Sequence, residues 1–259
     1  GLDSGRHFEL LLRLRDGESG ALLTPDRFMP AAERFRLSVP IDRMVVGMAL
    51  DWLEAHPVEA DSVTTCAINL SGDALIDEAF IGFVAERLRR SSFPSSRLCF
   101  EITETSAVRD LGRAQRFIDQ LRALGCRFAL DDFGTGFCSF SYLRSLDVDY
   151  FKIDGSFVRE MDSSPLAAAV VRSITQIAHA LHKQTIADHT ESEQMRTTLT
   201  ELGVDFGQGY AIARPQQPAT ALAAPTAAAT VMPATAPAPP PPGATPALYR
   251  QSVRSRCTT

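Results

Sequence analysis

Polar side chains stand at the ends of successive apolar segments that we interpret as β-strands. In chain order they are Asn69, Glu101, Asp131 with Asp132, Lys152 with Asp154, and Asp188, with Gln208 in a last segment and Glu9 inside an early one. Carboxylates crowded into one pocket repel one another, which raises their pKa values unless a cation compensates. All-oxygen ligands suit the hard cations Mg²⁺ and Mn²⁺. Two such metals close together would clamp the attacking and leaving oxygens of a phosphate ester.

A single acid after a strand has an ordinary explanation, because most such residues cap the next helix or carry a loop charge. We assign Asp77 and Asp110 to that class. Five successive strand ends that each carry a polar or acidic residue are much harder to explain as caps. The pattern therefore predicts one shared functional site.

The elements that must position these residues alternate between strand and helix. Apolar residues recur at helical spacing within 77–90, 111–124 and 166–181. The predicted strands are 7–15, 63–70, 97–104, 127–133, 149–155, 184–188 and a last strand and turn within 204–212. Repeated β-α units imply an α/β fold with a mostly parallel sheet, and this length favours a closed β/α barrel of the TIM type. The carboxyl ends of barrel strands meet on one face, so these polar side chains are expected to converge there.

The end of the chain has a different composition from the rest. Residues 215–259 are mostly Ala, Pro and Thr and hold ten of the sixteen prolines. The segment has almost no aliphatic periodicity, so it cannot bury enough apolar surface to offset the entropy that ordering would cost. We therefore predict a disordered tail. Residues 1–214 remain for one domain, a common size for a single α/β barrel.

Charge and cysteine content narrow the class of protein. The net charge is −5, and the three arginines of the tail leave the remainder near −8, which argues against a broad nucleic-acid surface. The five cysteines are odd in number and show no C-x-x-C spacing, which indicates buried thiols in a reducing compartment. No signal peptide and no apolar run of membrane-spanning length are found. A cytoplasmic location is predicted, with membrane attachment through an upstream region left open.

Six short motifs resemble the EAL-domain family of bacterial cyclic di-GMP phosphodiesterases and follow in that family's order and spacing. They are FELLLRLR (8–15), INLS (68–71), FEITE (100–104), LDDFGTGF (130–137), FKIDGSFV (151–158) and FGQGY (206–210). The resemblance covers about residues 7–216, and the pairing of DDFGTG with KID is its most specific part. It implies an EAL-like modified TIM barrel.

The sequence departs from the family pattern in two places. Members usually read A-E-G-V-E where this chain has ADHTE (187–191), so an aspartate, Asp188, stands where the family has a glutamate. The family also carries a strand and a helix before its E-A-L segment, whereas only seven residues precede Phe8 here. A barrel that lacked this strand would expose an edge and lose core contacts.

The resemblance implies two metal sites and a set of roles around them. The metal ligands would be Glu9, Asn69, Glu101 and Asp131 for one cation, Asp131 and Asp132 for the second, and Asp154 in support. The catalytic residues would be Lys152, Asp188, Glu101 and Asp131, with Asp188 as general base. Arg13 and Gln208 would bind substrate, Glu104 would hold the loop from Asp132 to Ser139, and Glu191 would anchor the loop behind the base.

The implied reaction is hydrolysis of one phosphodiester bond of cyclic di-GMP to linear pGpG, with two divalent cations, Mg²⁺ or Mn²⁺. Asp188 is one methylene shorter than the family's glutamate, which withdraws its carboxylate by roughly 1.5 Å and favours slow turnover. His189 follows it as a weaker candidate for a substitute base, an exposed loop histidine being the plainer interpretation. The alternative function is a degenerate domain that acts as a cyclic di-GMP receptor or a protein-interaction module. A homodimer and an upstream sensor or GGDEF-type domain are the candidate partners that the resemblance suggests.

Overall fold

The structure is a computed structural model that describes residues 6–136, 142–217 and 244–255. Its strands are β1 (Arg6–Asp16), β2 (Leu22–Leu23), β3 (Val63–Asn69), β4 (Leu98–Thr103), β5 (Arg127–Phe133), β6 (Tyr150–Ile153), β7 (Gln184–Ala187), β8 (Phe206–Gln208) and β9 (Ala244–Ser255). Its α-helices are α1 (Pro25–Arg34), α2 (Ser38–Ala55), α3 (Pro57–Asp61), α4 (Glu78–Arg90), α5 (Glu104–Arg109), α6 (Leu111–Arg122), α7 (Gly155–Glu160), α8 (Pro165–Ala180) and α9 (Glu193–Glu201). Short 3₁₀ turns are η1 (Ala74–Ile76), η2 (Ser95–Arg97) and η3 (Tyr142–Arg144).

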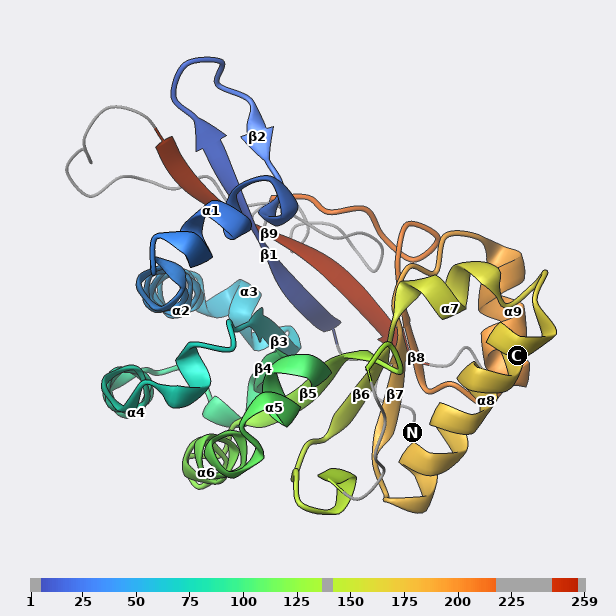
Figure 1. The fold of residues 1–259 in the computed structure, drawn as a ribbon. Coiled ribbons are helices and arrows are strands. Elements are labelled where there is room, and N and C mark those ends of the chain that lie inside the picture. The colour runs from blue at the N-terminus through green and yellow to red at the C-terminus, as the bar shows by residue number, and fades with distance from the viewer. Residues whose placement is uncertain (1–5, 137–141, 218–243, 256–259) are drawn as a thin grey trace.

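The strands curl into a ring. The order is β1-β3-β4-β5-β6-β7-β8-β9, and β9 pairs back onto β1. From β1 through β8 each step of the ring is parallel, whereas β9 runs antiparallel to both of its neighbours. Strand β2 folds back as a short antiparallel extension on the far end of β1. The mostly parallel, TIM-type barrel that the sequence predicts is thus confirmed (Figure 1).

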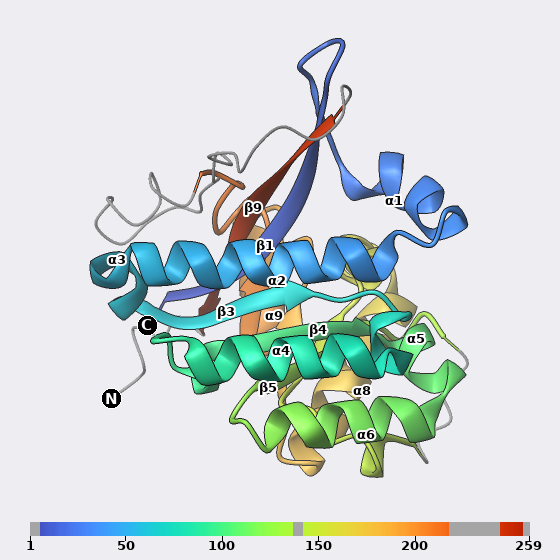
Figure 2. The ribbon, with the colours of Figure 1, turned by 90° about the vertical axis from the view of Figure 1, so that its left-hand side faces the viewer.

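The helices cover the outside of the barrel and bury the apolar stripes that their sequences carry. In Figure 2 the helices α2, α4 and α6 lie side by side across the strands β3, β4 and β5. Helix α4 shows why: Phe80, Val84 and Leu88 recur at a spacing of four residues and are all buried, while the opposite face is charged. Among the described residues, no helix has both the length and the apolar character needed to cross a membrane.

The C-terminal segment differs from the expected disorder over part of its length. Residues 244–255 form strand β9, which pairs with β1 from Asp16↔Ala244 to His7↔Val253 and with β8 from Gln208↔Val253 to Phe206↔Ser255. Residues 218–243 of the predicted tail lie outside the described part. The average composition of the tail did not predict this strand, because Ala and Pro dominate the segment. Its last stretch nevertheless contains the strand-favouring residues Leu248, Tyr249 and Val253. Strand β9 therefore pairs with the edges of both β1 and β8 and closes the ring.

Removing β9 is expected to open the barrel between β1 and β8. Ten residues of β1 would lose their strand partners. At roughly 1 kcal/mol for each net hydrogen bond, we expect the free energy of unfolding to fall by at least about 3 kcal/mol. The two exposed edges should also promote self-association. Urea unfolding and gel filtration of a chain that ends at residue 243 measure both effects, with removal of 256–259 alone as the control. Equal stability and equal elution volume for the two truncations would contradict the pairing.

Candidate active site

The barrel interior is built in two layers, because alternate residues of a strand point to the same face. The lower layer is mainly apolar and consists of Ala67, Cys99, Ala129, Tyr150, Ile186 and Phe206. Two residues further along each of these strands, or just beyond its end, stands a polar residue. Together with Glu9 of β1 they form what we call the polar ring: Glu9, Asn69, Glu101, Asp131, Lys152, Asp188 and Gln208. A cavity of only about 20 Å³ lies among the residues of this layer and its neighbours, so the interior beneath the ring is packed.

Lys152 is the centre of the polar ring. Its Nζ lies 2.5 Å from Glu101 Oε2, 3.0 Å from Asp131 Oδ2 and 3.3 Å from Glu9 Oε2. The side chain is only 1 % exposed, and those of Glu9 and Glu101 are 6 % and 2 % exposed. Three carboxylates from three strands thus converge on one buried cation.

Two amide side chains from other strands also hold Glu9. Asn69 Nδ2 donates to Glu9 Oε1 at 2.5 Å, and Gln208 Nε2 donates to Glu9 Oε2. Because β3 carries Asn69 and β8 carries Gln208, these bonds connect strands on both sides of β1. The four residues therefore form one hydrogen-bonded group.

The pKa values in the ring show how strongly its groups depend on one another. Burial raises the pKa of Glu101 well above its usual value, the neighbouring carboxylates raise it further, and Lys152 opposes the rise only in part. Burial opposes charge on Lys152, but Asp131, Glu101 and Glu9 together hold its pKa well above the usual value. Burial also disfavours charge on Glu9, yet Lys152 and the two amides lower its pKa overall. The lysine therefore stays charged and neutralises part of the ring.

Asp131 and Asp132 stand side by side at the end of β5 with different surroundings. Asp132 N donates to Asp131 Oδ1 at 2.9 Å, and the backbone of Asp132 is left-handed at φ 54°. Burial and the charges of Asp131 and Asp154 raise the pKa of Asp132 to about 6. Asp154 itself caps α7, with its Oδ1 accepting from Ser156 N at 2.8 Å. A second group of carboxylates thus lies beside the polar ring without a lysine of its own.

Asp188 follows β7 and turns one carboxylate oxygen back onto its own chain. Its Oδ1 accepts from the backbone N–H of His189 at 2.8 Å. Burial raises the pKa of Asp188, while Lys152 lowers it and Glu9 raises it, so its carboxylate feels the charges of the polar ring. His189 adopts a left-handed backbone conformation at φ 55°, and its ring leaves no space for a side chain at Gly155.

Glu104 is buried behind the loop that follows β5. Its Oε2 accepts from Gly134 N at 3.0 Å, and its Oε1 accepts from the hydroxyl of Tyr142. Gly136 passes so close to the carboxylate that an added Cβ would lie 3.3 Å from Glu104 Cδ. Residues 137–139 of the predicted loop lie outside the described part. Glu104 contacts described residues before and after them, Gly134 and Tyr142.

The remaining predicted residues lie at the border of the site. Arg13 is half-buried four residues beyond Glu9 on β1, and its Nη1 donates to the Leu12 carbonyl at 2.8 Å. Glu191 is exposed, with Oε1 3.7 Å from His189 Nδ1. Both side chains stand at the end of the barrel where the polar ring opens.

Comparison with known proteins identifies the family of the chain. The EAL domain family matches this chain over residues 2–215. The chain belongs to the EAL domain family.

Two curated relatives of this EAL domain are cyclic di-GMP phosphodiesterases by name. PdeB of Shewanella oneidensis is 40% identical over 211 residues, which are 82% of this chain and 24% of PdeB. PdeF of Escherichia coli is 35% identical over 83% of this chain and 29% of PdeF. The chain therefore spans less than a third of the length of each of these relatives. Among solved structures, the PaMucR phosphodiesterase in complex with c-di-GMP superposes with a TM-score of 0.74 at 32% identity, covering 78% of this chain and 82% of that one.

The polar ring of the EAL domain has the kind of donor atoms that a hard cation binds, but its carboxylate oxygens are gathered around Lys152 instead. Carboxylate and amide oxygens are what Mg²⁺ and Mn²⁺ prefer. Among the described residues, however, no three His, Cys, Asp or Glu side chains are placed so that they could hold a metal ion as they stand. The Lys152 ammonium occupies the point where the oxygens of Glu9, Glu101 and Asp131 converge. A divalent cation would therefore compete with Lys152 for those oxygens.

Two further residues of the site carry no clear signal in the motifs. The hydroxyl of Tyr142 donates a hydrogen bond to Glu104 Oε1, and the sequence around this turn does not predict that contact. Thr190 is fully buried, and its backbone N–H donates to the Gln208 carbonyl at 2.7 Å, which ties the loop after β7 to β8. In the sequence, Gly209 is the residue that could have indicated this close contact, because any side chain at that position would collide with the backbone of Thr190.

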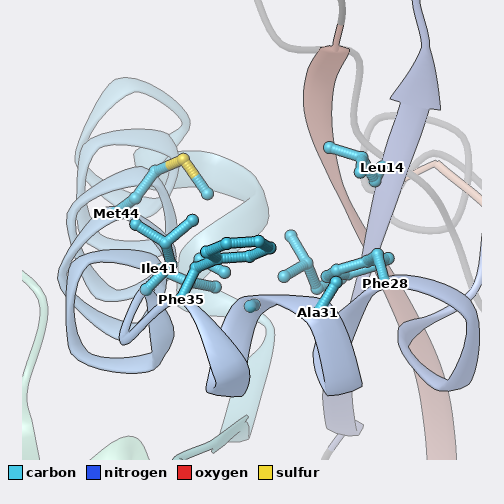
Figure 3. Close-up of a pocket in the computed structure, with 9 residues that line it drawn as sticks. Leu14, Phe28, Ala31, Phe35, Ile41 and Met44 are labelled. Carbon is cyan, nitrogen blue, oxygen red and sulfur yellow. The ribbon is translucent and has the colours of Figure 1, made fainter.

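A larger apolar pocket lies away from the polar ring. It has a volume of about 290 Å³ and is formed between β1, α1 and α2 by residues that include Leu14, Phe28, Ala31, Phe35, Ile41 and Met44 (Figure 3). Its lining contains no charged or hydrogen-bonding side chain that could recognise a phosphate. The pocket is therefore not a second site for an anionic nucleotide.

Proposed function

We propose that this EAL domain hydrolyses one phosphodiester bond of cyclic di-GMP and releases linear pGpG. The observation that carries the proposal is the convergence of Glu9, Glu101 and Asp131 on Lys152 at the open end of the barrel. A group of acids around a fixed cation suits phosphate chemistry, because it can collect further cations and position an anionic ester among them. The relatives named as cyclic di-GMP phosphodiesterases support the choice of substrate.

Each side chain then has a task that its position allows. Glu9, Asn69, Glu101 and Asp131 would hold one divalent cation, and Asp131 with Asp132 a second, Asp154 lying nearby in support. When bound, these cations would lower the pKa of the attacking water and stabilise the leaving oxygen.

The other residues act on the water and on the phosphate. Lys152 supplies a permanent positive charge beside the phosphate, and the guanidinium fork of Arg13 suits a phosphate oxygen. Asp188 accepts the proton of the attacking water on its other oxygen, Oδ2. Gln208 holds Glu9, and Glu104 keeps the loop after β5 in shape.

A second candidate, a domain that binds cyclic di-GMP without hydrolysis, is favoured by one observation. Asp188 Oδ1 is used by its own turn, which leaves only the other oxygen of an already short side chain for a water molecule. A general base must come within hydrogen-bond distance of the proton it removes. If Asp188 fails in this respect, the rest of the site remains suited to binding.

One assay separates the two candidates. The protein is incubated with cyclic di-GMP and Mn²⁺ or Mg²⁺, and pGpG is followed by chromatography, while calorimetry measures binding of cyclic di-GMP in Ca²⁺. We expect binding and metal-dependent formation of pGpG. Tight binding with no product would support the receptor and contradict the enzyme. Absence of binding would contradict both and leave only interaction with a protein partner.

A further inference from the structure

One buried carboxylate lies outside the barrel interior and outside the loop that Glu104 holds. Asp42 is on α2, packed against the outer side of the barrel, and is 4 % exposed. The other buried carboxylates of the described chain, Glu9, Glu101 and Glu104, all belong to the site described above. A buried acid needs polar partners to offset its loss of water, so its partners show what it does.

Asp42 accepts its hydrogen bonds from Ser71. The hydroxyl of Ser71 donates to Oδ2 at 2.5 Å, and its backbone N–H lies 3.2 Å from Oδ2 and 3.4 Å from Oδ1. Ser71 stands two residues after Asn69, in the loop that leaves β3. Between them, the N–H of Leu70 donates to the carbonyl of Glu101 at 2.9 Å. The loop is thus tied to a helix on one side and to the neighbouring strand on the other.

The next residue leaves the loop little freedom to move. A Cβ at Gly72 would lie 2.8 Å from the Ser106 hydroxyl, so Gly72 packs directly against α5. Ser106 is itself held by Thr103, the N-cap of that helix. Because Ser71 is fixed by Asp42 and Gly72 is fixed by α5, the direction in which the chain leaves Asn69 is determined from outside the barrel.

We propose that Asp42 is a positioning residue for Asn69, which it orients toward Glu9 by holding Ser71. The inference rests on the proposed function, since Asn69 and Glu9 belong to the set that would hold a cation. Asp42 touches neither substrate nor metal in this arrangement. It acts through two residues of backbone, and the result is the bond of 2.5 Å between Asn69 Nδ2 and Glu9 Oε1.

The ionisation of Asp42 gives an additional, independent signature. Burial raises its pKa to about 7, the hydrogen bonds from Ser71 oppose that rise, and the charge of Asp73, which faces it from the same loop, adds to it. Because the folded pKa is raised, this group favours the folded state below the unfolded pKa near 3.8. That contribution is lost as the pH rises through about 7. An asparagine at this position keeps an acceptor for Ser71 and does not titrate.

The first test measures Mn²⁺ affinity by calorimetry without substrate for wild type, Asp42→Ala and Asp42→Asn. Loss of a group that orients a ligand typically costs 10- to 100-fold in metal affinity, so we expect at least about a 10-fold loss for Asp42→Ala. Asp42→Asn should stay within about 3-fold of wild type in Mn²⁺ affinity at pH 6, and its thermal midpoint should change less than that of wild type between pH 5 and pH 8. Asp77→Ala, which removes the cap of α4 from Phe80 N, is the matched control and should lose stability but not Mn²⁺ affinity.

A second test needs no metal. The urea midpoints of Asp42→Ala, Asn69→Ala and the double variant are compared in EDTA. If Asp42 acts on Asn69, the two shifts are not additive. Additive shifts, or equal Mn²⁺ affinity for wild type and Asp42→Ala, would overturn the inference. A wild type that binds no Mn²⁺ would count against the proposed function, and the metal-free comparison would still decide the role of Asp42.

Discussion

Replacing Lys152 by methionine is expected to lower the free energy of unfolding of the metal-free protein by about 3–5 kcal/mol, because removing one partner leaves buried charges without compensation. Its ammonium contacts three carboxylates and is 1 % exposed. Hydrolysis of cyclic di-GMP should also fall by at least about 10²-fold, the loss typical of a missing donor to developing negative charge. Urea unfolding in EDTA and the pGpG assay measure the two effects.

The chain offers a matched control for this experiment. Lys152 and Lys183 are its only lysines. Lys183 pairs with Asp147 at 2.8 Å, and the side chain of Asp147 is 56% exposed. Lys183→Met should therefore cost no more than about 1 kcal/mol. Equal losses for the two variants would contradict the central place of Lys152 in the ring.

The pH dependence of the Lys152→Met variant has a definite sign. In the wild type the pKa of Glu9 lies below its usual value. Without the lysine, only the hydrogen bonds from Gln208 and Asn69 oppose the effect of burial on that pKa. Its folded pKa should then rise above the unfolded value, so that stability is lost as the pH increases. The difference in free energy of unfolding between variant and wild type should accordingly be smaller near pH 4.5 than near pH 7.5.

Lengthening Asp188 to glutamate is expected to raise kcat by about 10- to 100-fold. The added methylene extends the reach by roughly 1.5 Å, and a misplacement near 1 Å can cost on the order of 10²-fold in rate. In the present turn Asp188 Oδ1 accepts from His189 N, so the shorter side chain satisfies its own backbone. Steady-state kinetics with cyclic di-GMP and Mn²⁺ are the measurement.

The same chemical change at a distant cap provides the comparison. Asp110 caps α6 by accepting from Arg113 N at 3.1 Å, and Asp110→Glu should leave kcat unchanged. If Asp188→Glu binds cyclic di-GMP but is no faster than wild type, reach is not what limits turnover. A slower Asp188→Glu enzyme would mean that the site is already adapted to aspartate.

Much of the site could be predicted from the sequence because barrel geometry is regular. Strands of alternating pattern place residues two apart on one face, and parallel β-α units bring the carboxyl ends of all strands together. For this reason Glu101 and Asp131, thirty residues apart in the chain, could be assigned to one cluster from their positions at strand ends alone. The apolar layer beneath the ring follows from the same period of two.

Other features depend on contacts between distant segments that leave no local pattern. Strand β9 was hidden in an Ala- and Pro-rich segment, because pairing with β1 depends on an open edge elsewhere in the fold. The hydrogen bond from Ser71 to Asp42 spans 29 residues, and on α2 alone Asp42 is an ordinary helical acid. The oxygen that Asp188 turns toward His189 depends on a left-handed turn in the backbone.

The sequence by itself determined which residues stand at the strand ends, and therefore that acids, one lysine and two amides share the open end of a barrel. The tertiary structure alone decided how they share it. Lys152 lies at the centre, Glu9 is held from both sides, and Asn69 is directed from outside by Asp42. The physical reason is that the period of a strand fixes the face of a side chain, whereas its partner depends on distances set by the whole closed barrel.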